Sequence, residues 1–201
     1  MKTKLSIKTV LALLLSLILV IPSAYASSTP PPAEITPTYP GTNTKMVVGD
    51  VLYSNKSLYG SAAVVGHVGI VGSDYRIYHV TPVSDANGGG INDTIETYMG
   101  RHNAGEKIAV YRARYFDYTK AAKWAEQNYW RATEYSISVL DKLGTLDPNY
   151  CSKFIWQAFY FGGGVDVTGK NLGPNTYSLV YPLNFTYDQY FARITSFTAT
   201  H

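Results

Sequence analysis

The 201-residue chain contains one cysteine, Cys151, so no internal disulfide can hold its fold together. Its stability must therefore come from a hydrophobic core. The cysteine also opens a run of apolar residues at helical spacing: Cys151, Phe154, Ile155, Ala158 and Phe159. We predict that Cys151 begins an amphipathic helix, which Gly162-Gly163-Gly164 ends.

Residues 1–26 have the parts of a secretory signal peptide. A start with three lysines precedes an apolar run from Val10 to Ile21, and Ala24-Tyr25-Ala26 supplies the small residues of a cleavage site. Such a short run, at about 1.5 Å per residue, does not span a bilayer core of roughly 30 Å. We expect cleavage after Ala26 and a protein that is secreted, extracellular or cell-wall associated, with no integral membrane span after processing. An uncleaved signal anchor is the alternative.

The basic character of the chain is a property of the signal segment. The full chain has 17 Lys+Arg and 14 Asp+Glu, and the segment holds Lys2, Lys4 and Lys8 but no acid, which leaves 17 − 3 = 14 cations against 14 anions. The mature protein therefore has no charge excess that would favour nucleic acid or an anionic membrane. We expect a monomer with no nucleic-acid partner.

The remaining chain predicts a tether followed by one domain. Residues 27–45 are rich in Pro, Thr and Ser and have no apolar period, which is typical of an extended linker. Residues 46–201 are long enough for one domain with a sizeable core.

Helices and strands do not alternate regularly in this domain, which favours an α+β architecture with an antiparallel sheet. Val64–Val71 and Arg76–Thr81 predict a hairpin around the turn at 72–75. Asp117 is expected to cap a helix over about Tyr118–Arg131. The other predictions are strands within 47–53, 108–115 and 193–197, a loop over 83–90 and a short helix over 93–99.

The chemistry of a lone thiol depends on its surroundings. A thiol attacks a carbonyl as the thiolate, so it needs a base. The first turn of a helix favours the anion, so we expect a lowered pKa for Cys151. His67 is the candidate base, because Gly66 and Gly69 beside it let other groups approach. The alternative is an inert, buried cysteine.

His79 is the candidate residue that orients the base. If the hairpin turn is centred on Ser73, His67 and His79 face each other on one side of the sheet, within about 5 Å at Cβ. The alternative is a structural histidine that bonds a backbone carbonyl. His102 lies in a polar stretch and His201 at the chain end, so we expect both to be exposed to solvent.

Other kinds of site find little support in the sequence. No spacing of His, Cys, Asp and Glu resembles a metal site, and no glycine-rich phosphate loop opens a helix, so we expect no cofactor and no metal. The backbone N–H of Cys151 is one candidate oxyanion donor. Tyr53 and Tyr150 are candidate substrate-binding residues, and Tyr53 is also a candidate second oxyanion donor.

Four segments carry a resemblance to a known family. They are Gly49-Asp50-Val51, Gly66-His67-Val68-Gly69-Ile70, His79 twelve residues after the first histidine, and Tyr150-Cys151-Ser152. Together they resemble the circularly permuted papain-like amidases, the YiiX-like and lecithin:retinol acyltransferase-like branch of the NlpC-type superfamily. The histidine precedes the cysteine, which is the permuted order, and the resemblance spans residues 47–197.

The resemblance implies a papain-like α+β domain with Cys151 as nucleophile, His67 as base and His79 in the third, polar position. It further implies a thiol hydrolase that cleaves amides through an acyl-enzyme. A secreted location makes cell-wall (peptidoglycan) peptides the first choice of substrate. The alternatives are a lipid or N-acyl amide/ester hydrolase or acyltransferase and, in another class, a non-catalytic peptide- or lipid-binding module.

Overall fold

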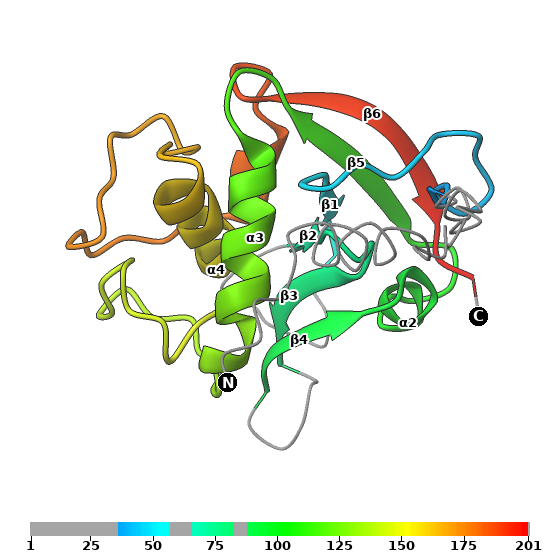
Figure 1. Cartoon of the computed structure of the whole chain (residues 1–201). Coiled ribbons are helices and arrows are strands. Elements are labelled where there is room, and N and C mark those ends of the chain that lie inside the picture. Colours follow the sequence, from blue (N-terminus) through cyan, green and yellow to red (C-terminus); the bar gives the residue numbers. More distant parts are fainter. Residues whose placement is uncertain (1–35, 57–65, 83–87, 201) are drawn as a thin grey trace, which may run out of the picture. The chain divides into compact units, whose positions relative to one another are not determined.

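A six-stranded antiparallel sheet forms the centre of the domain (Figure 1). The computed structural model describes residues 36–56, 66–82 and 88–200, so the predicted signal peptide, residues 27–35 of the tether and His201 lie outside the described residues. The strand order is β4-β3-β2-β1-β5-β6. The strands are β1 Val51–Ser54, β2 His67–Val71, β3 Ile77–Thr81, β4 Gly89–Asp93, β5 Lys107–Ala113 and β6 Phe191–Thr198.

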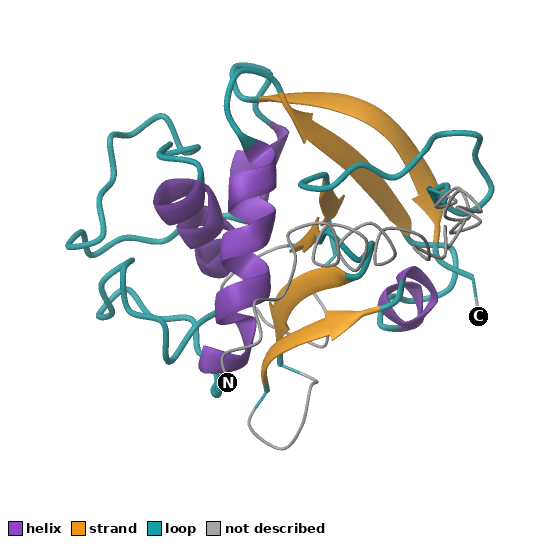
Figure 2. Ribbon diagram, in the orientation of Figure 1, coloured by secondary structure: helices purple, strands orange, loops and turns teal. Residues whose placement is uncertain are grey.

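The helices lie on both sides of this sheet (Figure 2). They are α2 Ile95–Gly100, α3 Tyr118–Asn128 and α4 Cys151–Gln157, with the 3-10 turns η1 Tyr129–Arg131 and η3 Pro182–Thr186 and the π-helical turn η2 Ala158–Gly162. Helices α3 and α4 pack against β2 and β3. Within the described ranges no helix is both long and apolar enough to cross a membrane.

Each face of the sheet has its own hydrophobic core. Val68 and Ile70 of β2 point to the face that α4 covers, whereas Val71 points to the face that Tyr98 of α2 covers. Successive side chains of a strand alternate between faces, so His67 falls on the α2 face together with Val71. The sheet thus separates the α4 core from the layer that holds the histidine.

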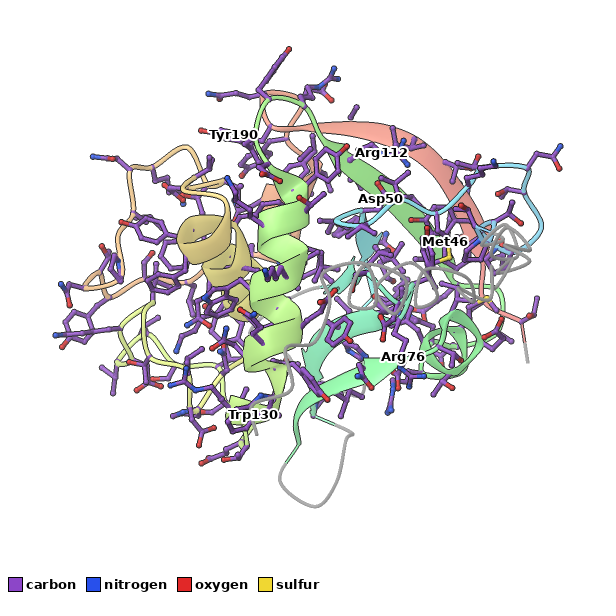
Figure 3. The ribbon with its side chains drawn as sticks, in the orientation of Figure 1. Met46, Asp50, Arg76, Arg112, Trp130 and Tyr190 are labelled. Carbon is purple, nitrogen blue, oxygen red and sulfur yellow. The ribbon has the colours of Figure 1, made fainter. Side chains whose placement is uncertain are left out.

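The domain begins earlier than the sequence predicted. Tyr39, which lies inside the predicted tether over 27–45, is fully buried and its hydroxyl donates a hydrogen bond to Asp50 Oδ2 at 2.7 Å. Met46, labelled in Figure 3, is also buried. The compact unit therefore starts at Thr36, because the tyrosine supplies both a ring for the core and a partner for a buried carboxylate.

That carboxylate, Asp50, ties the start of the domain to the sheet. Arg112 of β5 donates to it from Nε at 2.7 Å and from Nη2 at 2.9 Å, and Figure 3 shows the two residues close together. The backbone N–H of Val47 donates to Oδ2 at 3.2 Å. The acid of the Gly49-Asp50-Val51 segment therefore has a structural role, since paired buried charges are costly to separate.

Several predicted elements are confirmed, and one strand was missed. The hairpin of β2 and β3 is present, and Asp117 caps α3 by accepting from the backbone N–H of Thr119 and Lys120. The missed element is β4, because the sequence analysis assigned its glycines to a loop. A Cβ on Gly90 would lie only 1.9 Å from the carbonyl oxygen of Tyr129, so this strand position needs glycine to let η1 approach.

Candidate active site

The hairpin places His67 and His79 on the same face of the sheet but in a diagonal arrangement. Ile70 pairs with Tyr78, so the hairpin is centred on Asp74, one residue later than predicted. The partner of each position thereby shifts by two residues, which preserves the face. Diagonal neighbours on a sheet lie roughly 7–8 Å apart, within reach of ring side chains.

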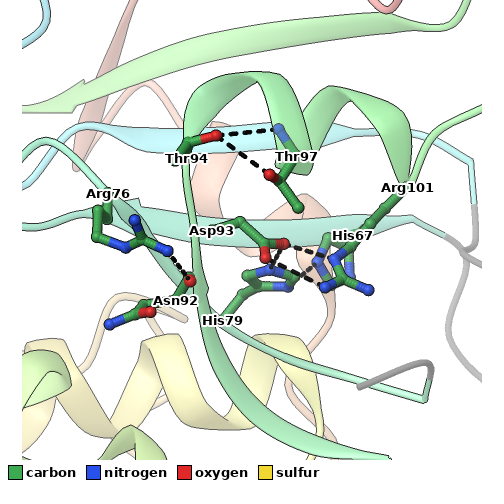
Figure 4. Close-up of polar contacts among 8 residues, drawn as sticks. All are labelled: His67, Arg76, His79, Asn92, Asp93, Thr94, Thr97 and Arg101. Atoms are coloured by element: carbon green, nitrogen blue, oxygen red, sulfur yellow. Dashed lines mark hydrogen bonds and ion pairs between the residues drawn. The ribbon is translucent and has the colours of Figure 1, made fainter. Parts of the chain in front are cut away.

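A chain of hydrogen bonds connects the two histidines to a buried acid (Figure 4). Nε2 of His67 lies 2.9 Å from Nδ1 of His79, so the predicted contact is present. Nε2 of His79 lies 2.9 Å from Oδ2 of Asp93, at the end of β4. Arg101 holds this carboxylate from the other side, with Nε 2.5 Å from Oδ2 and Nη2 3.1 Å from Oδ1. Asp93 and Arg101 were absent from the predicted site.

The ionised carboxylate of Asp93 determines where the protons lie in this hydrogen-bonded series. Burial pushes the pKa of Asp93 up, but hydrogen bonds from His79 and Arg101 outweigh it and lower the pKa to about 2. The ionised carboxylate only accepts hydrogen bonds, so Nε2 of His79 must carry a proton. Burial lowers the pKa of His79, so its ring is neutral and Nδ1 accepts a hydrogen bond.

The tautomer of His67 follows from its contact with His79, because Nδ1 of His79 accepts a hydrogen bond. Its Nε2–H donates to His79, and burial together with the nearby His79 and His102 lowers its pKa well below the usual value. The neutral ring therefore has its lone pair on Nδ1. Arg101, Asp93 and His79 together thus determine which nitrogen of His67 can take a proton.

Cys151 reaches this end of the sheet from the opposite core. The N–H of Val71 bonds the carbonyl of Asp50 on the β1 side, so the N–H of Val68, three residues away, points to the β3 side. The pairing of β2 with β3 extends only to Ile70, which leaves that N–H to the sulfur of Cys151. The nucleophile candidate is therefore placed beside the residue that follows His67.

Cys151 has a raised pKa, in contrast to the lowered value that the sequence predicted. Burial raises it to about 11, against hydrogen bonds from Val68 and Ser152 that lower it. The thiol is 1% exposed, so loss of solvation outweighs the helix start. No direct hydrogen bond joins Cys151 to His67 within the part of the chain that the structure describes. The pair is thus a neutral thiol and a neutral imidazole.

We expect iodoacetamide to label Cys151 more slowly at pH 7 than it labels an unstructured cysteine, whose pKa is about 8.5. A raised pKa means that the folded protein releases this proton only at high pH, so the rate should keep rising from pH 8.5 towards 11. Timed labelling followed by mass spectrometry measures the rate. A plateau already reached at pH 7 would instead indicate a preformed ion pair with His67.

Tyr98 of α2 completes the buried cluster. A Cβ on Gly69 would lie 3.3 Å from the Tyr98 ring and 3.3 Å from His79 Cβ, so this glycine leaves room for both. The Tyr98 ring centroid lies 5.9 Å from that of His67 and 5.1 Å from that of His79. Its buried hydroxyl has no hydrogen-bond partner among the described residues. Burial raises the pKa of Tyr98 well above its usual value, and the negative charge of a Cys151 thiolate would raise it further.

Tyr98→Phe should leave the free energy of unfolding unchanged within about 0.5 kcal/mol or increase it, because the hydroxyl makes no bond with any described residue. Tyr39→Phe is the matched control, since its buried hydroxyl donates to Asp50 and its loss should cost about 1.5–3 kcal/mol. Urea unfolding measures both. A large loss for Tyr98→Phe would show that its hydroxyl has a partner in solution.

His102 is buried, although the sequence predicted exposure to solvent. It is 2% exposed, and its ring centroid lies 6.0 Å from that of His67 and 5.0 Å from that of Tyr98. Its Nδ1 lies 3.4 Å from Oε2 of Glu106, and burial followed by repulsion from His79 lowers its pKa to about 4. The backbone N–H of His102 bonds the last turn of α2, which turns the ring inward.

The two tyrosines proposed as substrate contacts have different positions. Tyr150 is 1% exposed and its hydroxyl accepts a hydrogen bond from the N–H of Val180 at 3.1 Å, so its observed contact is structural, and substrate binding by Tyr150 stays a prediction. This bond holds Val180 near the start of α4. Oγ of Ser152 also donates a hydrogen bond to the carbonyl of Val180, at 2.8 Å. Tyr53 is half-buried and borders a hollow in the sheet.

No family model matches the chain. It is 32% identical over 129 residues to an uncharacterised 30.3 kDa protein of Bacillus thuringiensis, a match that covers 58% of this chain and 44% of the relative. The chain thus spans under half the length of that relative.

A solved structure with a similar fold is that of metalloprotein yiiX from Escherichia coli O157:H7. The TM-score is 0.51 at 16% sequence identity, and the match covers 80% of this chain and 98% of that chain. The chain therefore has a YiiX-like α+β fold, as the resemblance implied. At this identity the likeness concerns the fold alone.

The residues of this site do not fit a metal centre. Both ring nitrogens of His79 are engaged in hydrogen bonds, and Nε2 of His67 is engaged in one. Over the described ranges, no three His, Cys, Asp or Glu side chains are grouped so that they could hold an ion. A zinc site would need three or four such ligands around one point.

Proposed function

We propose that this protein is a thiol hydrolase that cleaves amide bonds through an acyl-enzyme on Cys151, within a circularly permuted papain-like domain. One observation carries the proposal: Asp93, His79 and His67 form a hydrogen-bonded series that leaves the lone pair of the base on Nδ1. A nitrogen with a free lone pair is what a general base needs in order to take a proton. The proposal also draws support from Val68, the residue after His67, whose backbone N–H donates to the sulfur of Cys151.

The neutral pair favours general-base catalysis. As the sulfur of Cys151 forms its bond to the carbonyl carbon, Nδ1 of His67 takes the thiol proton. His67 then gives this proton to the leaving nitrogen, and the C–N bond breaks to leave a thioester. A water molecule that loses a proton to His67 attacks the thioester, which releases the acid and restores the thiol. His79 and Asp93 stabilise the transient imidazolium.

Cell-wall peptides are the proposed substrates, since the N-terminal segment predicts secretion. N-acyl or ester lipids are the second candidates, through the resemblance to the acyltransferase-like branch. A non-catalytic peptide- or lipid-binding module remains the alternative in another class. The engaged nitrogens of the histidines favour catalysis over such a module, because binding alone gives no reason for the order of donors and acceptors.

Turnover on two substrate sets distinguishes these functions. The purified protein and its Cys151→Ala variant are incubated with defined muropeptides and with N-acyl lipids, and the released amines are identified by mass spectrometry. Release from muropeptides by the wild type alone supports the proposal. Release from lipids alone assigns the second candidate, and binding without Cys151-dependent release identifies a binding module.

A further inference from the structure

A hollow of about 280 Å³ lies on the part of the sheet that α4 leaves open. Tyr53 of β1 and Ala109 and Tyr111 of β5 line it, and the two tyrosine rings meet edge to face with centroids 6.1 Å apart. Asn55, Lys107 and Arg193 complete the lining. The hollow therefore combines two aromatic rings with two cations.

Among the residues that the structure describes, no acidic side chain lines this hollow. Other arginines of the protein bind a partner: Arg112 binds Asp50, and Arg101 binds Asp93. Arg193, in contrast, has no hydrogen-bond or ion-pair partner among residues 36–56, 66–82 and 88–200. An unpaired guanidinium beside a second cation creates a local positive potential that an anion would stabilise.

Tyr53, which lines the hollow, packs beside the residue that precedes His67. A Cβ on Gly66, the residue before His67, would lie 3.5 Å from the ring of Tyr53 and 3.2 Å from Pro182 Cβ. The segment that leads into Pro182 is held against the start of α4, where Oγ of Ser152 bonds the carbonyl of Val180. A series of packing contacts therefore connects the start of α4, through Pro182 and Gly66, to Tyr53 in the hollow.

We propose that this hollow is a substrate subsite that binds a free carboxylate of a peptide, close to the amide bond that the protein cleaves. This subsite rests on the proposed function for its role, but its binding can be measured without turnover. The planar guanidinium of Arg193 matches a carboxylate through two parallel hydrogen bonds, and Lys107 adds a point charge. The rings of Tyr53 and Tyr111 pack against the aliphatic part of the same residue.

The subsite selects among peptides by charge. A cell-wall peptide with free carboxylates would bind, whereas the same peptide with carboxamides would leave both cations without a partner. Residues 27–201 carry 14 cations and 14 anions, so no overall field of this part of the chain would attract every anion, and the selection is local.

Binding to the Cys151→Ala protein tests the subsite. Titration calorimetry compares one muropeptide with free carboxylates to the same muropeptide with its carboxylates converted to carboxamides. We expect about tenfold tighter binding of the carboxylate form, which corresponds to one charge-assisted contact. The double change Lys107→Gln and Arg193→Gln should remove this preference, and Lys123→Gln, which removes an exposed cation of α3, should keep it.

Equal affinities for the two peptides, or a preference that survives the double change, would overturn the subsite. Failure of the proposed function has a different signature, since the wild type would then release no amine from either peptide while Cys151→Ala still discriminates between them. The circular dichroism spectrum of each variant confirms that the fold is retained.

Discussion

Replacement of His67 by alanine is expected to lower kcat/KM by about 10³-fold or more on whichever amide substrate the protein cleaves. The reason is that burial raises the pKa of the Cys151 thiol to about 11, so very little thiolate exists near neutral pH without a base. His67 offers Nδ1 as the one nitrogen of the hydrogen-bonded series with a lone pair to spare. Steady-state kinetics at pH 7 measures the loss.

The pH profile separates this catalytic loss from a structural one. Without the imidazole, residual activity should rise with pH as the thiol itself ionises, whereas the wild type should be active near neutrality. Arg76→Gln is a suitable control for a change in the same hairpin, since it removes a bond to the carbonyl of Asn92 away from the cysteine. Wild-type kinetics in His67→Ala would show that His67 is structural and that another group activates Cys151.

The sequence predicted the hairpin and the Cys151 helix because each has a strong local signal. Gly72-Ser73-Asp74-Tyr75 between two β-branched runs marks a turn, and the apolar residues after Cys151 recur at helical spacing. The contact between His67 and His79 was predicted because both residues lie on the same face of the hairpin. The one-residue error in the hairpin centre shifts the pairing by two residues, so both histidines stay on that face. The catalytic roles of these residues remain predictions.

Asp93 was not predicted as a site residue because the strand that it ends, β4, was not predicted. Asp93 ends β4, whose first residues are glycines that carry no side-chain pattern and normally indicate a loop. Those glycines are needed for the approach of η1, a contact between segments about forty residues apart that no local pattern encodes. Once β4 is in place, His79 pairs with Ile91, and Asp93 is the next residue along β4 on the same face.

The burial of Tyr39, His102 and Cys151 also depends on tertiary packing. The Pro- and Thr-rich composition around Tyr39 predicted an extended linker, and the polar neighbours of His102 predicted exposure to solvent. Both side chains are nevertheless buried. For Cys151 the helix start was correct, but its effect on the pKa was outweighed by loss of solvation. In each case the sequence gives the local preference and the surrounding core determines the outcome.

Removal of the carboxylate in Asp93→Ala is expected to lower kcat/KM by roughly 10²–10⁴-fold, although Asp93 lies two hydrogen bonds away from Nδ1 of His67. The carboxylate is what forces the proton of His79 onto Nε2. Without it, His79 can place its proton on Nδ1, which makes Nδ1 a donor towards His67. His67 must then accept through Nε2, and its own proton moves to Nδ1, where it can no longer take one from Cys151.

Loss of Asp93 also removes the carboxylate that Arg101 and His79 share. Repulsion from Arg101 already contributes to the lowered pKa of His67 and of His79. The imidazolium that forms during the reaction should therefore be less stable in Asp93→Ala, which lowers the maximal rate more than it changes KM. Arg101→Met together with Asp93→Ala should recover part of the rate, because it removes this repulsion.

The tautomers give the decisive measurement, because a change in the fold alone would not exchange them. Nitrogen chemical shifts of the histidine rings should show a protonated Nε2 on both His67 and His79 in the wild type. In Asp93→Ala we expect both protons on Nδ1. Asp93→Ala combined with His79→Ala should cost little more than the larger single loss, since both residues act on Nδ1 of His67 through one path. Additive losses, or unchanged tautomers, would show that Asp93 supports the fold without orienting the base.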